Sequence, residues 1–394
     1  MARAALCCLV EPGNQIVHEL VAAEGPVGAL DQLIEGDVRQ EALRGAVDAR
    51  LRGGNPHRLA ERALEHAERL GARIAIPEDD EWPLPVEELV RLAQPGAATR
   101  VDRDVFPPLC LWVRGAPPLS EALDRSVAVI GSRAATGYGI HVATELGYGL
   151  ADRGWTVVSG GAFGIDAAAH RGALTAGGLT VAILACGMDR PYPLGHAALF
   201  DRIAESGLLV TEWPPGAEPF RHRFLVRNRV IAAATRGTVV VEAAARSGAR
   251  QTLGRAIGLG RRAMVVPGPV TSAMSVGCHE LIRSYPQVRL VTSVAHVVEE
   301  VGLIGEDLTP LPRGPERPED RLDSVAAQVL EAVPRRRPIG LDEVAARAGV
   351  DIRTAMRQLS LLDQLGLVAG RDGAWRLAAP ARAVRGLSPE AGTG

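Results

Sequence analysis

From Ser126 onward the chain alternates short apolar runs with longer amphipathic stretches. Six runs are rich in β-branched residues, at 127–130, 156–159, 180–185, 208–212, 238–242 and 263–267. The segments between them have the periodicity of helices. Strands that are apolar throughout and separated by helices are typical of a parallel sheet covered on both faces. The sequence therefore predicts an α/β fold with a doubly wound parallel sheet, over residues 111–304.

The segments on either side of this core have a different pattern. Short helical stretches separated by glycines predict a small helical domain over 1–75, joined to the core by a connecting segment at 76–110. Four prolines among charged residues indicate a linker at 305–320. Residues 321–380 predict three helices and a hairpin, an arrangement that resembles a winged helix, in which Ile352, Met356, Leu359 and Leu362 face a core. Residues 381–394 are expected to form a flexible tail.

Composition excludes several classes of protein. The 394 residues are 47% hydrophobic and 23% charged, which is typical of a globular chain and not of a disordered one. No apolar run reaches the ~18 residues that a membrane span needs, so we expect a cytoplasmic protein without membrane contact. Five cysteines without a CxxC pair predict neither a disulfide framework nor a cysteine zinc site. Nine scattered histidines offer no metal-ligand spacing, and we expect neither a metal nor a cofactor.

Charge is distributed unevenly along the chain. All 44 basic residues are arginines. Residues 1–110 hold 12 of them against 19 acids, residues 111–298 hold 19 against 12, and residues 299–394 hold 13 against 15. The middle third therefore carries +7 while the first carries −7. We expect an anionic partner to bind to the middle of the chain.

Two glycine-rich loops follow the first two strands of the predicted sheet. The first strand ends in Gly131, Ser132 and Arg133, and the second ends in Ser159, Gly160 and Gly161, followed by Gly164 and Asp166. Ligands of an open parallel sheet bind at the carboxyl ends of its strands. Glycines allow the backbone to approach a phosphate, and serine and arginine side chains can bind its oxygens. The two loops predict an anion site; the alternative is a pair of tight turns in which Asp166 caps a helix.

A third segment, residues 220–231, combines aromatic rings with arginines. Ten arginines and only two glutamates lie between 217 and 262, a density that favours a polyanion over a single phosphate. Phe224 among these arginines fits the stacking and charge pattern of single-strand binding. The alternative is an amphipathic helix with a solvated arginine face and Phe224 in the core. Both roles for Phe224 remain open at this point.

Enzymatic interpretations have weaker support. A nicotinamide dehydrogenase needs G-x-G-x-x-G after the first strand, where this chain reads G-S-R-A-A-T-G. Glu242 and Asp166 could form a carboxylate pair, but no spacing joins a nucleophile to a base. These acids are expected to cap helices or to orient arginines. The sequence therefore predicts no enzyme.

The order of these motifs resembles the DNA-processing protein A (DprA/Smf) family. The motifs are 127–133, 159–170, 224–232, 239–243 and 265–268, ending in Val265-Val-Pro267-Gly268. The resemblance implies a Rossmann-like core between a SAM-like helical domain and a winged helix. It also implies a homodimer that binds single-stranded DNA, protects incoming or processed DNA and loads the RecA recombinase during transformation or recombination, without chemistry.

The resemblance also assigns roles to individual residues. Gly131, Ser132 and Arg133 would hold a phosphate, and Ser159, Gly160, Gly161 and Gly164 would line the same pocket. The backbone of neighbouring nucleotides would contact Arg221, Arg227, Asn228 and Arg229, and Phe224 would stack on a base. Asp166 and Glu242 would support the loops. The chain departs from the family pattern at 247–252, where Ser-Gly-Ala-Arg-Gln-Thr stands.

A second resemblance belongs to another class of protein. Nucleotide phosphoribohydrolases bind a nucleoside monophosphate at an analogous sheet edge, with similar loops. Their P-G-G-x-G-T-x-x-E signature is absent, because Pro269, Val270 and Thr271 follow Gly268 here. This enzyme class is the alternative to single-stranded DNA binding.

Overall fold

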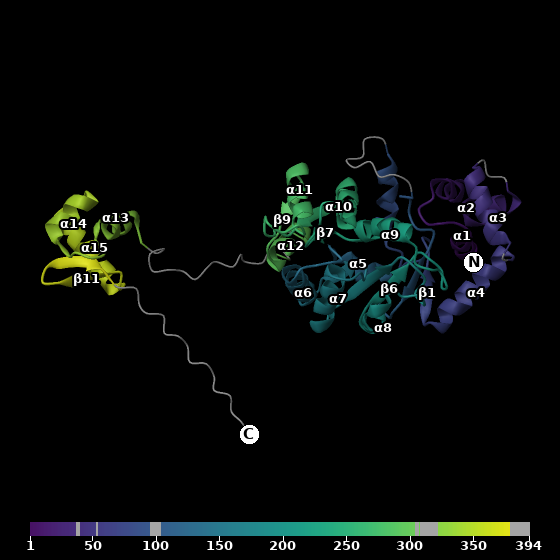
Figure 1. The fold of residues 1–394 in the computed structure, drawn as a ribbon, viewed down its shortest axis with the longest axis horizontal. Coiled ribbons are helices and arrows are strands. Elements are labelled where there is room, and N and C mark those ends of the chain that lie inside the picture. Colours follow the sequence, from purple (N-terminus) through teal and green to yellow (C-terminus); the bar gives the residue numbers. More distant parts are fainter. Residues whose placement is uncertain (37–39, 53, 95–103, 304–306, 308–321, 379–394) are drawn as a thin grey trace, which may run out of the picture. The chain divides into compact units, whose positions relative to one another are not determined.

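The computed structural model describes residues 1–36, 40–52, 54–94, 104–303, 307 and 322–378 (Figure 1). The chain divides into two compact units, Met1–Pro310 and Leu311–Gly394, and each is described by itself. Most of the predicted linker and the whole predicted tail lie outside the described residues. Within the described residues, no helix is both long enough and apolar enough to cross a lipid bilayer.

One sheet organises the first unit, with its strands in the order β1-β2-β6-β5-β4-β3-β7-β8-β9. From β6 to β9 every pair is parallel. The six predicted strands are confirmed, and the fold is α/β with a mostly parallel sheet. The strands are β1 (Ala72–Ala75), β2 (Leu111–Arg114), β3 (Ser126–Ile130), β4 (Thr156–Ser159), β5 (Thr180–Leu184), β6 (Leu208–Thr211), β7 (Gly237–Val240), β8 (Arg262–Val265) and β9 (Arg289–Leu290).

Two strands at one edge run against this direction. β2 pairs antiparallel with β6, and β1 pairs antiparallel with β2. The prediction of a helical segment over 1–75 is therefore wrong at its end, because Ala72–Ala75 are a strand of the central sheet. The sequence of this strand, Ala-Arg-Ile-Ala, ends in two apolar residues and does not alternate strictly, so the two-residue period of a half-buried strand is not visible in it.

Helices cover both faces of the sheet because strand side chains alternate. Val127 and Val129 of β3 pack in one cluster with α6 (Gly137–Ala151) and α7 (Ile165–Thr175). Ala128 and Ile130 pack in another with α9 (Arg221–Ala234) and α10 (Gly248–Gly258). The other elements of this core are η1 (Leu84–Ala93), α5 (Leu119–Asp124), η2 (Leu194–His196), α8 (Ala197–Ser206), α11 (Val276–Ser284) and α12 (Val294–Val301).

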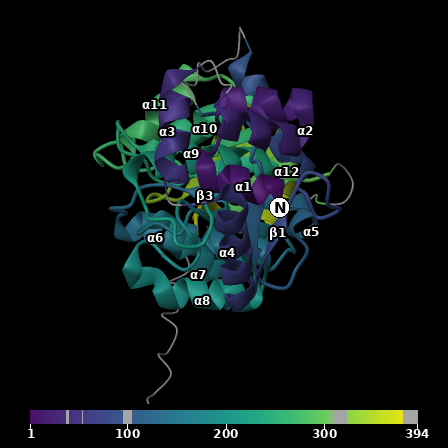
Figure 2. The same cartoon turned by 90° about the vertical axis from the view of Figure 1, so that its right-hand side faces the viewer.

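The N-terminal helices lie against the β1 edge of the sheet, where Figure 2 views them from outside. They are α1 (Ala2–Leu9), α2 (Gln15–Glu35), α3 (Glu41–Leu51) and α4 (Pro56–Arg69). Buried residues of these helices share one hydrophobic cluster with Trp112, Ala182, Leu184 and Phe200 of the sheet and α8. The helices therefore have no hydrophobic core of their own. The SAM-like assignment stays a prediction.

Over residues 322–378, the second unit contains three helices and a small sheet in the order β10-β12-β11. Leu359 and Leu362 are buried as predicted, whereas Ile352 and Met356 are 51% and 59% exposed. The predicted apolar stripe is wrong at these two positions, because the buried face runs through Ala355 and Leu359. The winged-helix assignment stays a prediction. The elements are α13 (Ser324–Ala332), β10 (Ile339–Gly340), α14 (Leu341–Ala348), α15 (Ile352–Gln364), β11 (Val368–Arg371) and β12 (Ala374–Leu377).

Candidate functional site

A cavity of about 490 Å³ lies at the carboxyl edge of the parallel strands. It lies between the loops that follow β3 and β4 and the helices α9 and α10, which Figure 1 labels on one face of the sheet. The cavity brings together residues that are more than 100 positions apart in the chain. Its lining includes Gly131, Ser132, Arg133, Ala162, Asp166, Phe224, Arg227, Asn228, Ser247, Thr252 and Met274.

The loop after β3 is fixed by Glu242, which follows β7. The Glu242 carboxylate accepts hydrogen bonds from the Thr136 backbone N–H at 2.9 Å and from the Thr136 hydroxyl at 2.6 Å. The Ser132 N–H donates to the Glu242 carbonyl at 2.8 Å. With its backbone held at both places, the loop presents an exposed Arg133 beside the cavity. Glu242 thus fixes the backbone conformation of the loop after β3.

The loop after β4 is fixed by Asp166 in the same way. Its carboxylate accepts from the Gly160 N–H at 3.1 Å and from the Ala162 N–H at 3.4 Å. Burial raises the pKa of the Asp166 carboxyl, and the charge of Arg227 opposes this shift. Asp166 therefore closes the loop through its two hydrogen bonds, and its carboxylate also interacts with the positive charge of Arg227.

Gly164 explains why this loop needs glycine. Its φ is +79°, and a Cβ there would lie 2.3 Å from the Ser132 carbonyl oxygen. The next residue, Ile165, donates its N–H to that carbonyl at 3.2 Å. The glycine therefore lets the β3 and β4 loops contact each other. This is a structural role, of the kind expected if the glycine-rich loops are tight turns.

Arg227 connects α9 to the sheet. Its Nη1 donates to the Gly160 carbonyl at 3.0 Å and also to the Ile183 carbonyl, and its Nε donates to Asn228 Oδ1 at 3.2 Å. Burial lowers the pKa of Arg227 to about 10, so the guanidinium stays charged at neutral pH. It lines the cavity while holding the β4 loop, and it contributes positive charge to the cavity wall.

The structure does not bring Arg229 to the cavity. Its side chain is fully buried, and two of its nitrogens donate to the Glu212 carboxylate at 2.7 and 2.6 Å. This bidentate ion pair joins α9 to the end of β6. The predicted contact of Arg229 with DNA has no support, because no surface of the side chain is open to a ligand.

Most of the ten arginines between 217 and 262 are similarly engaged by the protein. Arg223 binds Glu11, and Arg255 donates to the Leu225 carbonyl. Arg236, Arg250 and Arg261 form ion pairs with Asp124, Glu280 and Glu88. The density of arginine in this segment therefore reflects internal contacts more than a polyanion surface.

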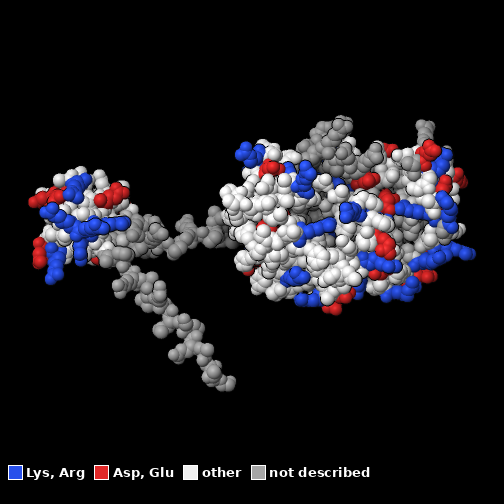
Figure 3. Space-filling model, viewed as in Figure 1, with Lys and Arg blue, Asp and Glu red and all other residues white. Residues whose placement is uncertain are grey.

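Two predicted site arginines differ from these. Among the residues that the structure describes, Arg133 and Arg221 are exposed and form no ion pair. Figure 3 shows one face of the first unit, on which acidic and basic side chains mix over the N-terminal helices, while the middle of the face is mostly uncharged and carries several basic and a few acidic groups. Of these two arginines, Arg133 lines the cavity.

Phe224 is half-buried and contacts both the cavity and a small hydrophobic cluster. Its ring lies in the cavity wall, with the guanidinium carbons of Arg133 and Arg227 at 5.1 and 5.9 Å from the ring centroid. The ring of Tyr192 meets it edge-on at 5.4 Å. Phe224 also packs against a small cluster of Ala185, Trp213 and Val226. The structure therefore supports a ring that is anchored on one side and faces the cavity on the other.

The sequence predicts no binding role for the lining residues Ser247, Thr252 and Met274, although 247–252 departs from the family pattern. Ser247 caps α10 by accepting the Ala249 N–H at 3.2 Å, and Thr252 lies one turn further along that helix. Met274 contacts Ser132, with Sδ and Oγ 3.4 Å apart. A serine before a helical stretch is a capping signal that could have found Ser247. No local pattern connects Met274 with a loop 142 residues earlier.

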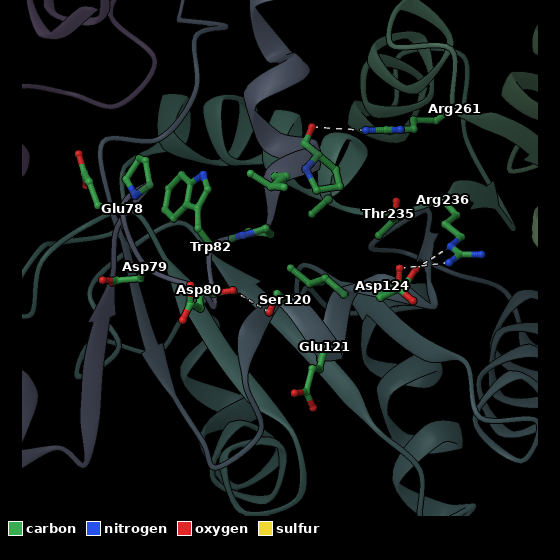
Figure 4. A pocket seen from close by; sticks show the side chains of 16 residues that line it. Glu78, Asp79, Asp80, Trp82, Ser120, Glu121, Asp124, Thr235, Arg236 and Arg261 are labelled. Atoms are coloured by element: carbon green, nitrogen blue, oxygen red, sulfur yellow. Dashed lines mark hydrogen bonds and ion pairs between the residues drawn. The ribbon is translucent and has the colours of Figure 1, made fainter.

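A larger cavity of about 950 Å³ lies at the amino ends of the strands (Figure 4). Its acidic lining comprises Glu78, Asp79, Asp80, Glu121 and Asp124. The two arginines labelled there are engaged, since Arg236 binds Asp124 and Arg261 binds the Pro85 carbonyl. An excess of carboxylates disfavours an anion. The smaller cavity is therefore the better candidate for an anionic ligand.

Comparisons with known proteins identify relatives over most of the chain. Residues 75–302 match the family model described as DNA recombination-mediator protein A. A putative DNA processing protein DprA of Mycobacterium tuberculosis is 46% identical over 379 residues, which are 95% of this chain and 94% of that protein. Protein Smf of Escherichia coli is 35% identical over 254 residues, covering 63% of this chain and 67% of that protein.

A solved structure agrees with these matches. The X-ray structure of DNA processing protein A from Streptococcus pneumoniae has a TM-score of 0.60 and 29% sequence identity. The match covers 76% of this chain and 96% of that one. Since the family model spans more than half of the chain and includes both loops, α9 and α10, this chain belongs to the DNA recombination-mediator protein A (DprA/Smf) family.

Proposed function

We propose that this protein binds single-stranded DNA in the cavity between the β3 and β4 loops and the helices α9 and α10. The observation that carries the proposal is Arg133, an exposed arginine without a carboxylate partner among the described residues. It lies beside Ser132 and Phe224, so charge, a hydroxyl and an aromatic face meet at one place. Membership of a family of DNA recombination mediators makes a DNA strand the anion of choice.

The cavity suggests how a strand would be held. A phosphate would bind Ser132 and Arg133, close to the first turns of α7 and α10, where backbone N–H groups favour anions. The adjoining base would stack on the open side of Phe224. Arg221 and Asn228 would reach the backbone of neighbouring nucleotides. Arg227 would mainly hold the β4 loop in place for the DNA, because its guanidinium already donates to the Gly160 carbonyl of that loop.

These contacts predict weak dependence on DNA sequence. Phosphate contacts and stacking on ring faces carry little sequence information, which requires groups that reach base edges. In a duplex the bases are already stacked on each other and cannot lie on Phe224. We therefore expect single strands to bind better than duplexes of the same length.

The wider role follows from the family. We propose a cytoplasmic, non-catalytic mediator that forms a homodimer, protects incoming or processed single strands and loads RecA during transformation or recombination. The family description as a recombination mediator supports this role. Light scattering tests the dimer, since a dimer of 41.5 kDa chains has twice that mass. Retention of RecA by the immobilised protein, with and without single-stranded DNA, tests the partner.

DNA binding is tested by titrating single-stranded and duplex oligonucleotides of equal length at several salt concentrations. The single strand should bind more tightly throughout, and different sequences should bind similarly. Equal affinity for the duplex would contradict the proposed site.

The alternative, a nucleotide phosphoribohydrolase, remains measurable in the same preparation. The cavity volume lies within the range of small-molecule sites. Release of free base from nucleoside monophosphates by the purified protein would favour the enzyme. Binding of single strands without base release would favour the DNA-binding role.

A further inference from the structure

Two cysteines far apart in the sequence meet at the junction of the N-terminal helices and the sheet. Cys7 lies on α1, and Cys110 directly precedes β2. Their sulfur atoms are 3.1 Å apart although the residues are 103 positions apart. Both thiols are free. The separation is only about 1 Å longer than the ~2.05 Å bond of a disulfide, so small movements would join them.

The elements that carry the two thiols are held to each other independently of the sulfur atoms. Arg3 of α1 donates to the Leu109 carbonyl at 3.1 Å, next to Cys110. The same arginine forms an ion pair with Glu78 at 2.7 Å. Buried residues of α1 and Cys110 also belong to one hydrophobic cluster. The approach of the thiols is therefore imposed by packing on both sides.

The two cysteine residues differ in their exposure to solvent. Cys7 is partly exposed, whereas Cys110 is buried. Both line a cavity of about 10 Å³ together with Val10, Leu109 and Glu212. An external reagent would therefore react first at Cys7, and Cys110 is placed to attack the product from inside.

The neighbouring Cys8 offers an internal comparison. Burial raises the pKa of the Cys8 thiol to about 12. The hydrogen bond with Cys110, together with burial, raises the pKa of the Cys7 thiol well above its usual range. Neither thiol is therefore an activated thiolate at neutral pH. If Cys7 forms a disulfide and Cys8 does not, the reason is that the Cys7 sulfur lies 3.1 Å from the Cys110 sulfur.

We propose that Cys7 and Cys110 form a reversible disulfide that ties α1 to the β2 edge of the sheet when the protein meets a low-molecular-weight disulfide. The Cys7 thiol loses its proton and attacks one sulfur of the oxidant; the S–S bond of the oxidant breaks, its other sulfur leaves as a thiolate that takes up a proton, and a mixed disulfide with Cys7 forms. Cys110 then attacks Sγ of Cys7 and releases the second small thiol. Two electrons pass from the protein to the oxidant, and the two thiol protons end on the two released thiols.

The test uses the full chain, first reduced and then incubated with oxidised glutathione. Blocking of the remaining thiols and cleavage after arginine leaves Cys7 and Cys8 on one peptide, 4–39, and Cys110 on another, 104–114. Mass spectrometry would detect the two peptides joined, but it could not say which of the adjacent cysteines is linked. The variants Cys7→Ser and Cys8→Ser decide this point, with Cys8→Ser as the matched control.

We expect the linked peptides in wild type and in Cys8→Ser, and at least a tenfold lower yield in Cys7→Ser. Oxidation should raise the melting temperature of wild type and of Cys8→Ser but not of Cys7→Ser, and dithiothreitol should reverse the rise. The proposal is overturned by linkage that survives in Cys7→Ser, by linkage between separate chains, or by the absence of linkage in wild type. An unchanged melting temperature of the linked protein would overturn the tie between α1 and the sheet.

Discussion

Truncation of Phe224 to alanine tests the proposed DNA site most directly. Stacking of a base on an aromatic ring contributes ~1–3 kcal/mol, which corresponds to a loss of about 5- to 150-fold in single-strand affinity. A fully buried Phe→Ala change costs ~3–5 kcal/mol of stability. Because Phe224 is half-buried and its packing neighbours are few, we expect roughly half of that destabilisation. We therefore expect a loss of ~1–3 kcal/mol in binding of the folded protein beside ~1.5–2.5 kcal/mol in stability, so the two quantities must be measured separately.

The assay combines thermal melting with fluorescence anisotropy of a labelled single strand, below the melting temperature of the variant. Phe220→Ala is the matched control, since Phe220 precedes α9, is 51% exposed and does not line the cavity. It should leave affinity nearly unchanged. Phe224→Leu keeps the apolar bulk and removes the aromatic face. Wild-type affinity in folded Phe224→Leu would refute stacking, and recognition would then rest on Arg133, Asn228 and the loops.

Three further outcomes follow from the charged contacts. Arg133→Ala should weaken binding of all single strands and reduce the slope of log affinity against log salt by ~0.7, one phosphate's share. Arg262→Ala, which removes an exposed arginine at the opposite edge of the sheet, should leave that slope unchanged. Glu212→Gln should cost ~3–5 kcal/mol of unfolding free energy in denaturant titrations because it leaves Arg229 charged and buried, and adding Arg229→Met should recover most of the loss. Burial alone would raise the pKa of Glu11, but hydrogen bonds from Arg223 and Trp213 outweigh it and lower the pKa. A lowered pKa stabilises the fold above the pKa of the unfolded chain, so the stability difference between wild type and Glu11→Gln should be largest above about pH 5.5 and shrink as pH falls below about 4.5. A difference that stays constant between pH 3 and 7 would contradict the role of Glu11.

The parallel part of the fold could be read from the sequence because its strands are apolar on both faces. Val127, Ala128 and Val129 face opposite layers of helices, and all three are buried, so the whole run is apolar. β1 gives no such signal, since Arg73 in its middle binds Glu81 outside the sheet. The antiparallel edge is decided by contacts between residues that lie far apart in the chain.

The candidate site could be predicted only as far as backbone geometry determines it. The loops at Ser132 and Gly164 follow from glycines at strand ends. Side-chain partners do not, because whether an arginine faces solvent or a carboxylate depends on tertiary packing. Arg133 and Arg229 look alike in sequence, yet Arg229 is buried against Glu212 while Arg133 is exposed.

The short outer strands of the nine-stranded sheet have a consequence for self-association. β9 consists of only Arg289 and Leu290, and β1 carries Arg73, whose side chain is tied to Glu81 and to the Gly115 carbonyl. Short strands and charged side chains leave few unpaired backbone groups on which a strand of another molecule could add. Addition of a strand from a second copy is therefore disfavoured at both margins of this sheet, and with it a continuous intermolecular sheet, the usual start of aggregation in β-rich proteins.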